Sequence, residues 1–325
     1  MPLDAATQAF LTAMRAAGGK PLYEQTVEQV RAGIKAASQQ LAPPATEVHE
    51  AADRRIPGPG GSEIAIRVYT PRPLREGDAL PIVLQYHGGG FVAGDLDTHD
   101  GIARYYCRHI DAVVVSVDYR LAPEHPFPAA VDDAYAALAW AADHARELGG
   151  DPDRIAVTGD SAGGTLAAVM CQLVKAQGGA PRISFQALVY PCTTLDPSAD
   201  YPSRRQCGGG EYFLSTADMD WFAGHYLTNR ASEAKDPRAS PLASRDLTGL
   251  PPALVITAGF DPLRDEGNEY ADRLAAAGVP VEYRCFEGTI HAFASFCGAI
   301  PAGAEALSLV AARLHRALHK EEIRT

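Results

Sequence analysis

Short apolar runs alternate along most of the chain with longer segments in which apolar residues recur every three or four positions. The short runs, rich in β-branched residues and typical of buried strands, occupy residues 81–86, 112–118, 155–158, 184–190, 253–258 and 281–286. The longer segments predict helices over residues 98–110, 130–148, 166–175, 266–277 and 303–319. Because strands that alternate with helices pair in parallel, the pattern predicts an α/β fold whose parallel sheet is covered by helices.

The chain begins with a different pattern. Residues 2–17 and 26–40 carry apolar positions at helical spacing, and a strand-like alternation begins near Glu47 and is clear over 62–69. The Pro-Gly-Pro-Gly-Gly stretch at 57–61 predicts a hairpin turn, and hence an antiparallel start to the sheet. We therefore separate the helical segment 1–45, which forms either surface helices or part of a lid, from the main domain 46–325.

A second irregular stretch lies between the last strands, at about residues 191–240. Here the pattern loosens, and the one helix it predicts, over 216–227, carries Trp221, Phe222 and Tyr226. We interpret this stretch as an insertion. Its aromatic helix either packs over a hydrophobic pocket or belongs to the ordinary core, and the pattern leaves both readings open.

The composition limits the class of protein. The chain has 325 residues, of which 46% are hydrophobic, enough for a large core in one α/β domain with an insertion. A formal net charge of −11 makes nucleic acid and anionic membrane surfaces poor partners. No apolar run approaches the ~18 residues that span a bilayer, and the N-terminus lacks the pattern of a signal peptide. We therefore expect a cytoplasmic protein without stable insertion into a membrane.

The cysteines and histidines give no sign of a metal site. Six cysteines are scattered without Cys-x-x-Cys spacing, so we expect free, mostly buried thiols. His315 and His319 are four positions apart in the last predicted helix, but the sequence offers no third ligand beside them. We expect no metal and no cofactor.

The glycine-rich turn after the third apolar run carries the clearest chemical signal. Gly159-Asp160-Ser161-Ala162-Gly163 stands between a predicted strand and a predicted helix and fits Gly-x-Ser-x-Gly. On so sharp a turn the Ser161 hydroxyl projects clear of the sheet, and N–H groups at the helix start face incoming negative charge. The pattern predicts Ser161 as a nucleophile and the Ala162 N–H as an oxyanion donor. An ordinary glycine-rich turn has the same pattern, so the prediction depends on the rest of the chain.

A run of three glycines follows the first apolar strand. The sequence His87-Gly88-Gly89-Gly90-Phe91 allows backbone N–H groups to approach a ligand oxygen closely, as in the His-Gly-Gly-Gly oxyanion motif of lipases and esterases. A flexible loop is the alternative reading. We predict that Gly88 and Gly89 supply oxyanion donors and that His87 holds the loop in place.

A serine hydroxyl needs a general base, and the base needs an orienting acid. In α/β-hydrolases the chain order is serine, acid, histidine. Asp261 directly follows the predicted strand 253–258, which places it at the carboxyl edge of the sheet. Its competitors Asp265 and Glu266 lie at a helix start, where the helix dipole favours carboxylates without any catalytic role. We therefore assign the acid to Asp261.

Three histidines lie beyond the predicted acid. His315 and His319 stand among basic residues of the terminal helix, which suits a solvated face. His291 lies after the last predicted strand, where the fold places the base. An isolated loop histidine is usually structural, but chain order and position agree with Ser161 and Asp261. We assign the base to His291.

Together these motifs identify a family. The chain resembles the hormone-sensitive lipase family of α/β-hydrolases, specifically its microbial esterases, in residues 87–91, 118–124, 159–164, 261–267 and 291. The resemblance implies the α/β-hydrolase fold, with a mostly parallel, twisted, eight-stranded sheet flanked by helices. It also implies a helical cap built from residues 1–45 and the insertion. One departure is Ala292, where the family pattern His-Gly-Phe has glycine.

The resemblance implies hydrolysis of short- to medium-chain carboxylic esters through an acyl-enzyme, without a cofactor. We further expect substrate contacts from Phe91, Asp160, Trp221, Phe222 and Phe293. Similar esterases are often dimers, and the last predicted strand is a candidate edge for a homodimer. The alternatives are a small-ligand receptor on the same fold, of a kind that has lost the histidine, and an amidase or thioesterase that shares the triad.

Overall fold

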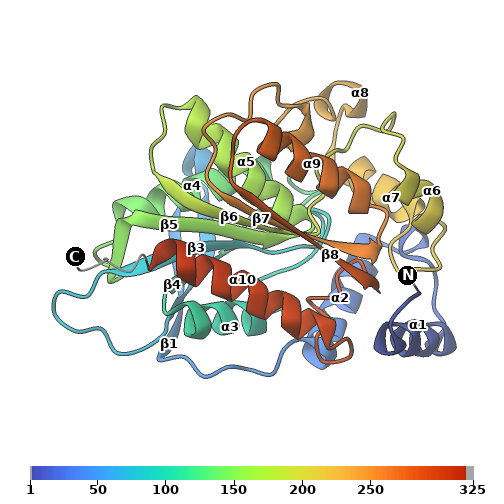
Figure 1. The fold of residues 1–325 in the computed structure, drawn as a ribbon, viewed down its shortest axis with the longest axis horizontal. Coiled ribbons are helices and arrows are strands. Elements are labelled where there is room, and N and C mark those ends of the chain that lie inside the picture. Colours follow the sequence, from blue (N-terminus) through green and yellow to red (C-terminus); the bar gives the residue numbers. More distant parts are fainter. Residues whose placement is uncertain (1, 320–325) are drawn as a thin grey trace.

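The computed structural model describes residues 2–319 and places eight strands in one twisted sheet, in the order β1-β2-β4-β3-β5-β6-β7-β8 (Figure 1). The strands are β1 (Glu50–Pro57), β2 (Glu63–Thr70), β3 (Leu80–Tyr86), β4 (Val113–Asp118), β5 (Gly150–Asp160), β6 (Ile183–Val189), β7 (Ala253–Phe260) and β8 (Val281–Ile290). The strands β1 and β2, and also β2 and β4, pair antiparallel, and all the other neighbours pair in parallel. The expected mostly parallel sheet with an antiparallel start is confirmed.

The helices form a layer on each side of the sheet and a group at one end. They are α1 (Ala5–Ala17), α2 (Val27–Leu41), α3 (Asp100–Ile110), α4 (Ala129–Asp143), α5 (Ala162–Ala176), α6 (Pro202–Cys207), α7 (Thr216–Tyr226), α8 (Arg230–Glu233), α9 (Arg264–Ala276) and α10 (Ala302–Leu318). The helices α4, α5 and α9 cover one face of the sheet, and α3 and α10 cover the other (Figure 1). None of the helices within residues 2–319 is long and apolar enough to cross a membrane.

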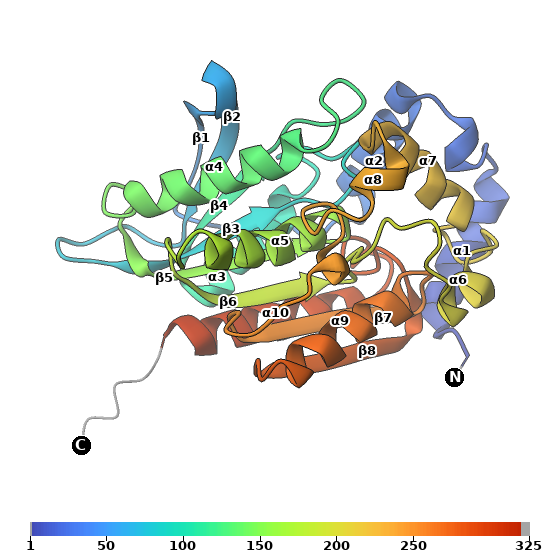
Figure 2. The ribbon, with the colours of Figure 1, turned by 90° about the horizontal axis from the view of Figure 1, so that it is seen from above.

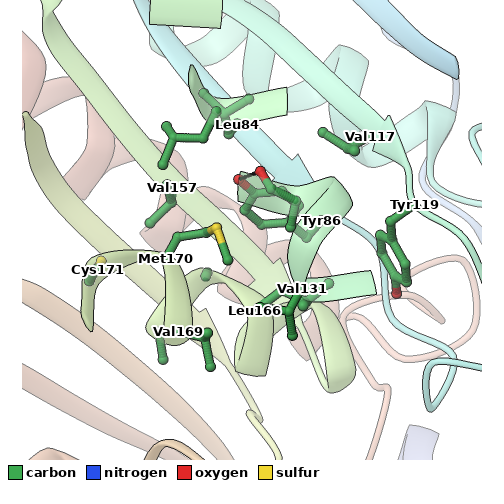
Figure 3. Close-up of a cluster of buried hydrophobic side chains, with 14 of the residues drawn as sticks. Leu84, Tyr86, Val117, Tyr119, Val131, Val157, Leu166, Val169, Met170 and Cys171 are labelled. Atoms are coloured by element: carbon green, nitrogen blue, oxygen red, sulfur yellow. Dashed lines mark hydrogen bonds between the residues drawn. The ribbon is translucent and has the colours of Figure 1, made fainter. Parts of the chain in front are cut away.

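The sheet is buried on both faces, which explains why its central strands read as continuous apolar runs. Successive side chains of a strand point to opposite faces. Leu84 of β3 lies in the cluster under α4 and α5, together with Val157 and Met170, whereas Val83 lies in the cluster under α3 and α10 (Figure 3). Each such buried aliphatic side chain contributes roughly 1.5–3 kcal/mol to folding. The packed sheet is therefore a firm base for the loops at its carboxyl edge.

Several element boundaries differ from those predicted, and three of them have a clear physical reason. The helix predicted over 130–148 ends at Asp143, and turns follow as far as Gly149, whose φ of +70° lies in the region that favours glycine. The strand β5 starts at Gly150, earlier than its apolar run, because Gly150 already pairs with Leu80 of β3, and a register shift separates this pair from Ile155 and Ile82. The strand β8 continues through Glu287-Gly288-Thr289 to Ile290, since a register shift lets Ile290 pair with Phe260. His291 therefore follows a strand directly.

The N-terminal helices and the insertion lie together at one end of the sheet (Figure 2). Backbone N–H of Tyr23 donates to Asp218 Oδ1 at 3.2 Å, and Arg15 donates to the Glu211 carbonyl at 2.8 Å. The insertion contains two short helices, α6 and α8, that were not predicted; with six and four residues they are too short for a periodic pattern. These contacts join two segments far apart in the sequence, beside the carboxyl ends of the strands.

Candidate active site

Ser161 occupies the sharp turn between β5 and α5 with a φ of +52°, which is unusual for a residue other than glycine. The turn is possible because the strand and the helix meet at glycines. A Cβ on Gly159 would lie 2.3 Å from the Gly163 carbonyl oxygen, and a Cβ on Gly163 would lie 2.0 Å from the Tyr86 carbonyl oxygen. Both contacts are too close for any side chain. The Gly-x-Ser-x-Gly pattern is thus required by the packing of this turn.

Ser161, His291 and Asp261 form one hydrogen-bonded chain. The Ser161 Oγ lies 2.9 Å from His291 Nε2, and His291 Nδ1 lies 2.7 Å from Asp261 Oδ2. A carboxylate only accepts hydrogen bonds, so Nδ1 carries the imidazole proton and Nε2 is free to accept from the serine hydroxyl. The other oxygen of Asp261, Oδ1, accepts the Leu263 N–H at 2.8 Å. The arrangement can therefore remove a proton from Ser161.

Each of these three residues is the first after a strand. Ser161 follows β5, Asp261 follows β7 and His291 follows β8. Asp261 is fully buried and His291 is 5% exposed, so water competes little for the hydrogen bonds between them. Parallel strands end at the same edge of a sheet, which is why positions 130 residues apart in the sequence meet here.

The competing acids and histidines lie elsewhere. Asp265 and Glu266 stand in the first turn of α9, as expected, where they bind backbone N–H groups of the insertion and of the segment after β6. The rings of His315 and His319 stack at 4.3 Å on α10, and a nitrogen of each meets the Ile110 carbonyl. None of these four side chains is part of the hydrogen-bonded chain at Ser161.

The glycine loop after β3 differs from the prediction in one respect. The Gly88 N–H donates to Asp160 Oδ1 at 3.1 Å and is therefore not available to a substrate oxygen. Within residues 2–319, the N–H groups of Gly89 and Gly90 make no hydrogen bond, nor does that of Ala162 at the start of α5. The available donors are thus Gly89, Gly90 and Ala162. The assignment of Gly88 is corrected because its N–H anchors the loop to the nucleophile turn.

The half-buried Asp160 and the fully buried His87 hold this loop in place. Although burial opposes the ionisation of Asp160, the charge of His99 and a hydrogen bond from it keep the pKa of Asp160 below its ordinary value. His87 stacks on Tyr119 at 4.2 Å, its Nδ1 lies 2.8 Å from the Gly88 carbonyl oxygen, and burial lowers its pKa to about 4. A neutral His87 can donate its Nδ1–H to that carbonyl, which agrees with the prediction that His87 holds the loop in place.

The five predicted substrate contacts fall into two groups. Phe91 is 3% exposed and Phe293 is fully buried, Phe91 against Tyr226 and Phe293 in an aromatic cluster. Phe91 and Phe293 offer almost no surface to a substrate, and Asp160 is occupied by the loop. Trp221 and Phe222, on α7, are half-buried, and the Phe222 ring lies against Gly90. These two remain the candidates for contact with a substrate.

Several residues of the site were not predicted from the sequence. Three glycines in a row do not reveal which N–H groups are free, so Gly90 was missed. His99 and Tyr226 are single residues on elements whose position relative to the loop depends on the whole fold. A search for buried aromatic positions on α7 would have found Tyr226, since Phe222 and Tyr226 lie one turn apart.

Known proteins resemble this chain in sequence and in fold. The model of a protein family with the description "alpha/beta hydrolase fold" matches residues 83–295. The chain is 46% identical over 297 residues to the carboxylic ester hydrolase LipN of Mycobacterium tuberculosis, covering 90% of this chain and 77% of that protein. It is 36% identical over 302 residues to an ethyl acetate hydrolase of Pseudomonas putida, covering 92% of each. The structure of a hyperthermophilic esterase from the archaeon Pyrobaculum calidifontis superposes with a TM-score of 0.90 at 42% identity, covering 97% of this chain and 98% of that one.

Proposed function

The chain belongs to the hormone-sensitive lipase family of α/β-hydrolases, and we propose that it hydrolyses short- to medium-chain carboxylic esters through an acyl-enzyme on Ser161. The single observation that carries this proposal is the hydrogen-bonded chain from Ser161 through His291 to Asp261. Its geometry is that of an activated nucleophile, in which the nucleophile contacts a base and the base is held by a third group.

In the proposed reaction, Ser161 Oγ attacks the ester carbonyl carbon while His291 Nε2 takes the hydroxyl proton. Asp261 fixes the tautomer of the imidazole and stabilises the cation that forms. The collapse of the tetrahedral intermediate transfers that proton to the leaving alcohol and leaves the acyl group on Ser161. A water molecule, deprotonated by His291, then releases the carboxylic acid and restores the serine.

The negative charge on the carbonyl oxygen needs donors that are already in place. We assign this role to the N–H groups of Gly89, Gly90 and Ala162, which are not paired within residues 2–319. A single donor of this kind contributes roughly 3 kcal/mol to stabilisation of the transition state. Trp221 and Phe222 are the proposed wall of the acyl or alcohol site, and their bulk supports the preference for small esters.

A small-ligand receptor without activity is the less favoured function. The kind of receptor considered above has lost the histidine, whereas here His291 contacts both Ser161 and Asp261. Amide and thioester hydrolysis use the same triad and remain further activities to be measured. How fast amides and thioesters react relative to esters depends on the leaving group.

The test is hydrolysis of p-nitrophenyl esters from acetyl to palmitoyl, with a p-nitroanilide and a thioester measured in parallel. We expect a rate that peaks at short or medium acyl chains and is abolished in Ser161→Ala. Ser308→Ala, at an exposed position of α10, is the matched control and is expected to keep the full rate. A Ser161→Ala enzyme that retains the rate would refute the proposal. Hydrolysis of the anilide or the thioester alone would show that the substrate is an amide or a thioester and not an ester.

We also propose that two copies pair through β8 and that the protein works in the cytoplasm. Among residues 2–319, the strand β8 pairs with β7 alone and so lies at the edge of the sheet, and its Tyr283 is 37% exposed. The six cysteines are all free thiols, which suits a reducing compartment. Light scattering on the wild type and Tyr283→Lys tests the pairing: we expect a dimer that the lysine variant dissociates, and a monomeric wild type would refute it.

A further inference from the structure

The oxyanion loop has a backbone conformation that most residues avoid. Gly89, Gly90 and Phe91 follow one another with φ values of +119°, +62° and +62°. Glycine adopts such angles freely, but a residue with a side chain is strained in the left-handed region. Phe91 keeps this conformation only if the surrounding structure holds it there. The contacts of its side chain are therefore part of what shapes the loop.

The side chain of Phe91 is held by α7 of the insertion. Its ring stacks on the ring of Tyr226 with centroids 4.0 Å apart and an interplanar angle of 8°. Phe91 is 3% exposed and Tyr226 is 1% exposed, so the stack is closed to water. Phe127 packs on Tyr226 edge to face at 5.7 Å, and its N–H donates to the Tyr226 carbonyl at 2.8 Å. Tyr226 thus has a fixed place from which to hold Phe91.

A second side chain of α7 lies on the neighbouring residue of the loop. A Cβ built on Gly90 would lie 2.3 Å from Phe222 Cδ1, so the Phe222 ring rests directly on the backbone of Gly90. Phe222 and Tyr226 are four positions apart and project from the same face of the helix. One face of α7 therefore contacts two successive residues of the loop.

The start of α7 is fixed in turn by the N-terminal segment. Ser215 and Asp218 form a capping box, with the Asp218 N–H donating to Ser215 Oγ at 3.0 Å. Asp218 Oδ2 accepts the Ser215 N–H at 2.9 Å in this box, and Asp218 Oδ1 accepts the Tyr23 N–H at 3.2 Å. A continuous set of contacts therefore leads from the N-terminal segment through α7 to the oxyanion loop.

We propose that α7 sets the position of the oxyanion donors, and that Tyr226 is a positioning residue that acts through Phe91. The inference rests on the esterase function proposed above. The insertion then does more than enclose a substrate, because its docking on the loop places the N–H groups of Gly89 and Gly90. Loss of the stack lets Phe91 leave the left-handed region and shifts the donors away from the oxyanion.

This role has a distinctive kinetic consequence. The donors bind the oxygen most strongly when it carries negative charge, so a displaced loop weakens binding of the transition state more than binding of the ester. We expect Tyr226→Leu to lower kcat about 10- to 100-fold, which is a smaller decrease than the complete removal of one oxyanion donor would cause. KM for a p-nitrophenyl acetate substrate changes by less than about threefold, since the ground-state ester uses these donors little.

Tyr226→Phe is the conservative variant that separates the ring from the hydroxyl. The Tyr226 hydroxyl is buried and has no hydrogen-bond partner among the described residues, whereas the ring makes the stack. We expect Tyr226→Phe to restore kcat to within about twofold of the wild type, as only the ring is needed. Equal loss of kcat in the two variants would contradict a role for the stack.

A variant that is destabilised elsewhere controls for general loosening of the fold. Leu138→Ala removes a fully buried side chain of α4 and lowers the stability of the fold, and we expect it to keep the wild-type kcat where it remains folded. If Leu138→Ala and Tyr226→Leu lose kcat in proportion to their loss of stability, the inference is wrong.

Inhibition by a trifluoromethyl ketone is a measurement that a purely structural role of Tyr226 would leave unchanged. Ser161 Oγ adds to its carbonyl carbon, the π electrons pass to the oxygen, and the hydroxyl proton passes to His291, so the oxyanion occupies the donors. We expect the inhibition constant of Tyr226→Leu to rise by the same factor by which kcat falls. An unchanged inhibition constant, or a wild-type kcat in Tyr226→Leu, overturns the inference. Absence of Ser161-dependent hydrolysis in the wild type would instead overturn the proposed function.

Discussion

Arg204 of α6 and Glu266 of α9 form an ion pair at the boundary between the insertion and the main domain. Arg204 Nε lies 3.2 Å from Glu266 Oε2, and the Glu266 side chain is fully buried. The other oxygen of Glu266 accepts the Thr193 N–H at 2.8 Å and the Thr194 N–H at 3.2 Å. Glu266, on the helix that starts three residues beyond Asp261, is thus bonded both to α6 and to the chain just after β6.

We predict that Arg204→Met lowers the free energy of unfolding by about 3 kcal/mol, because it leaves the Glu266 carboxylate buried without its charged partner. The matched control is Arg205→Met, whose side chain is 58% exposed and pairs with an exposed aspartate, and its effect is within about 0.5 kcal/mol. Urea denaturation of both variants measures the difference. Equal stability of the two variants would show that the buried pair does not hold the insertion.

Asp160 stands beside the nucleophile, but its carboxylate serves the oxyanion loop. We predict that Asp160→Ala lowers kcat about 10- to 100-fold with little change in KM, since Gly88 loses its acceptor and the donors that follow it shift. Asp160→Asn keeps an oxygen that can accept the Gly88 N–H and is expected to retain more activity. Steady-state kinetics on one short ester compares the three proteins. A fully active Asp160→Ala would mean that the loop keeps its shape without this bond.

His87 makes stability depend on pH. Burial lowers its pKa from an ordinary 6.5 to about 4, with His99 nearby adding to the effect. Between these values the unfolded chain binds a proton at position 87 that the folded chain does not, so stability falls as the pH drops through this window. The expected loss from His87 between pH 7 and pH 5 is about 2 kcal/mol. Unfolding of the wild type and of His87→Gln at both values measures it; parallel pH dependence of the two would exclude His87 as the cause.

Ala292 follows the catalytic histidine with a φ of +64°, in the region that favours glycine. We predict that Ala292→Gly raises the free energy of unfolding by up to about 1 kcal/mol. Glycine removes the strain of the left-handed conformation, and this gain exceeds the cost of the greater conformational freedom that glycine gives the unfolded chain. Ala304→Gly, in the exposed first turn of α10, is the control with the opposite sign and costs about 0.5–1 kcal/mol. Destabilisation of similar size in both variants would show that position 292 is unstrained.

The sequence was sufficient for the features that depend on local pattern and chain order. Apolar runs predicted the strands, and the Gly-x-Ser-x-Gly turn predicted the place of Ser161, because few residue types fit a turn in which a Cβ on Gly163 would meet a carbonyl at 2.0 Å. Asp261 and His291 could be chosen because parallel strands bring their carboxyl ends to one edge. The structure brings these three side chains into hydrogen-bond contact, and their catalytic roles stay proposals.

Features that depend on contacts between distant segments were beyond sequence reasoning. Gly88, Gly89 and Gly90 are equivalent as residue types, and only the position of Asp160 shows which N–H is already paired. Phe293 was expected at the substrate, but it is fully buried between Tyr190 and Phe286, two residues from other segments of the chain. The partners of Tyr226 depend on where the insertion docks, which no periodicity encodes.

In the proposed reaction Ser161 becomes covalently bonded to the acyl group of the substrate. The most direct measurement is intact-protein and peptide mass spectrometry after reaction with a p-nitrophenyl phosphonate ester, which traps the nucleophile without turnover. We predict one added phosphonyl group per chain, located on the peptide that contains Ser161, with activity lost in the same proportion and no label in Ser161→Ala. Loss of activity with the label on another residue, or labelling that is unchanged in Ser161→Ala, would contradict the account.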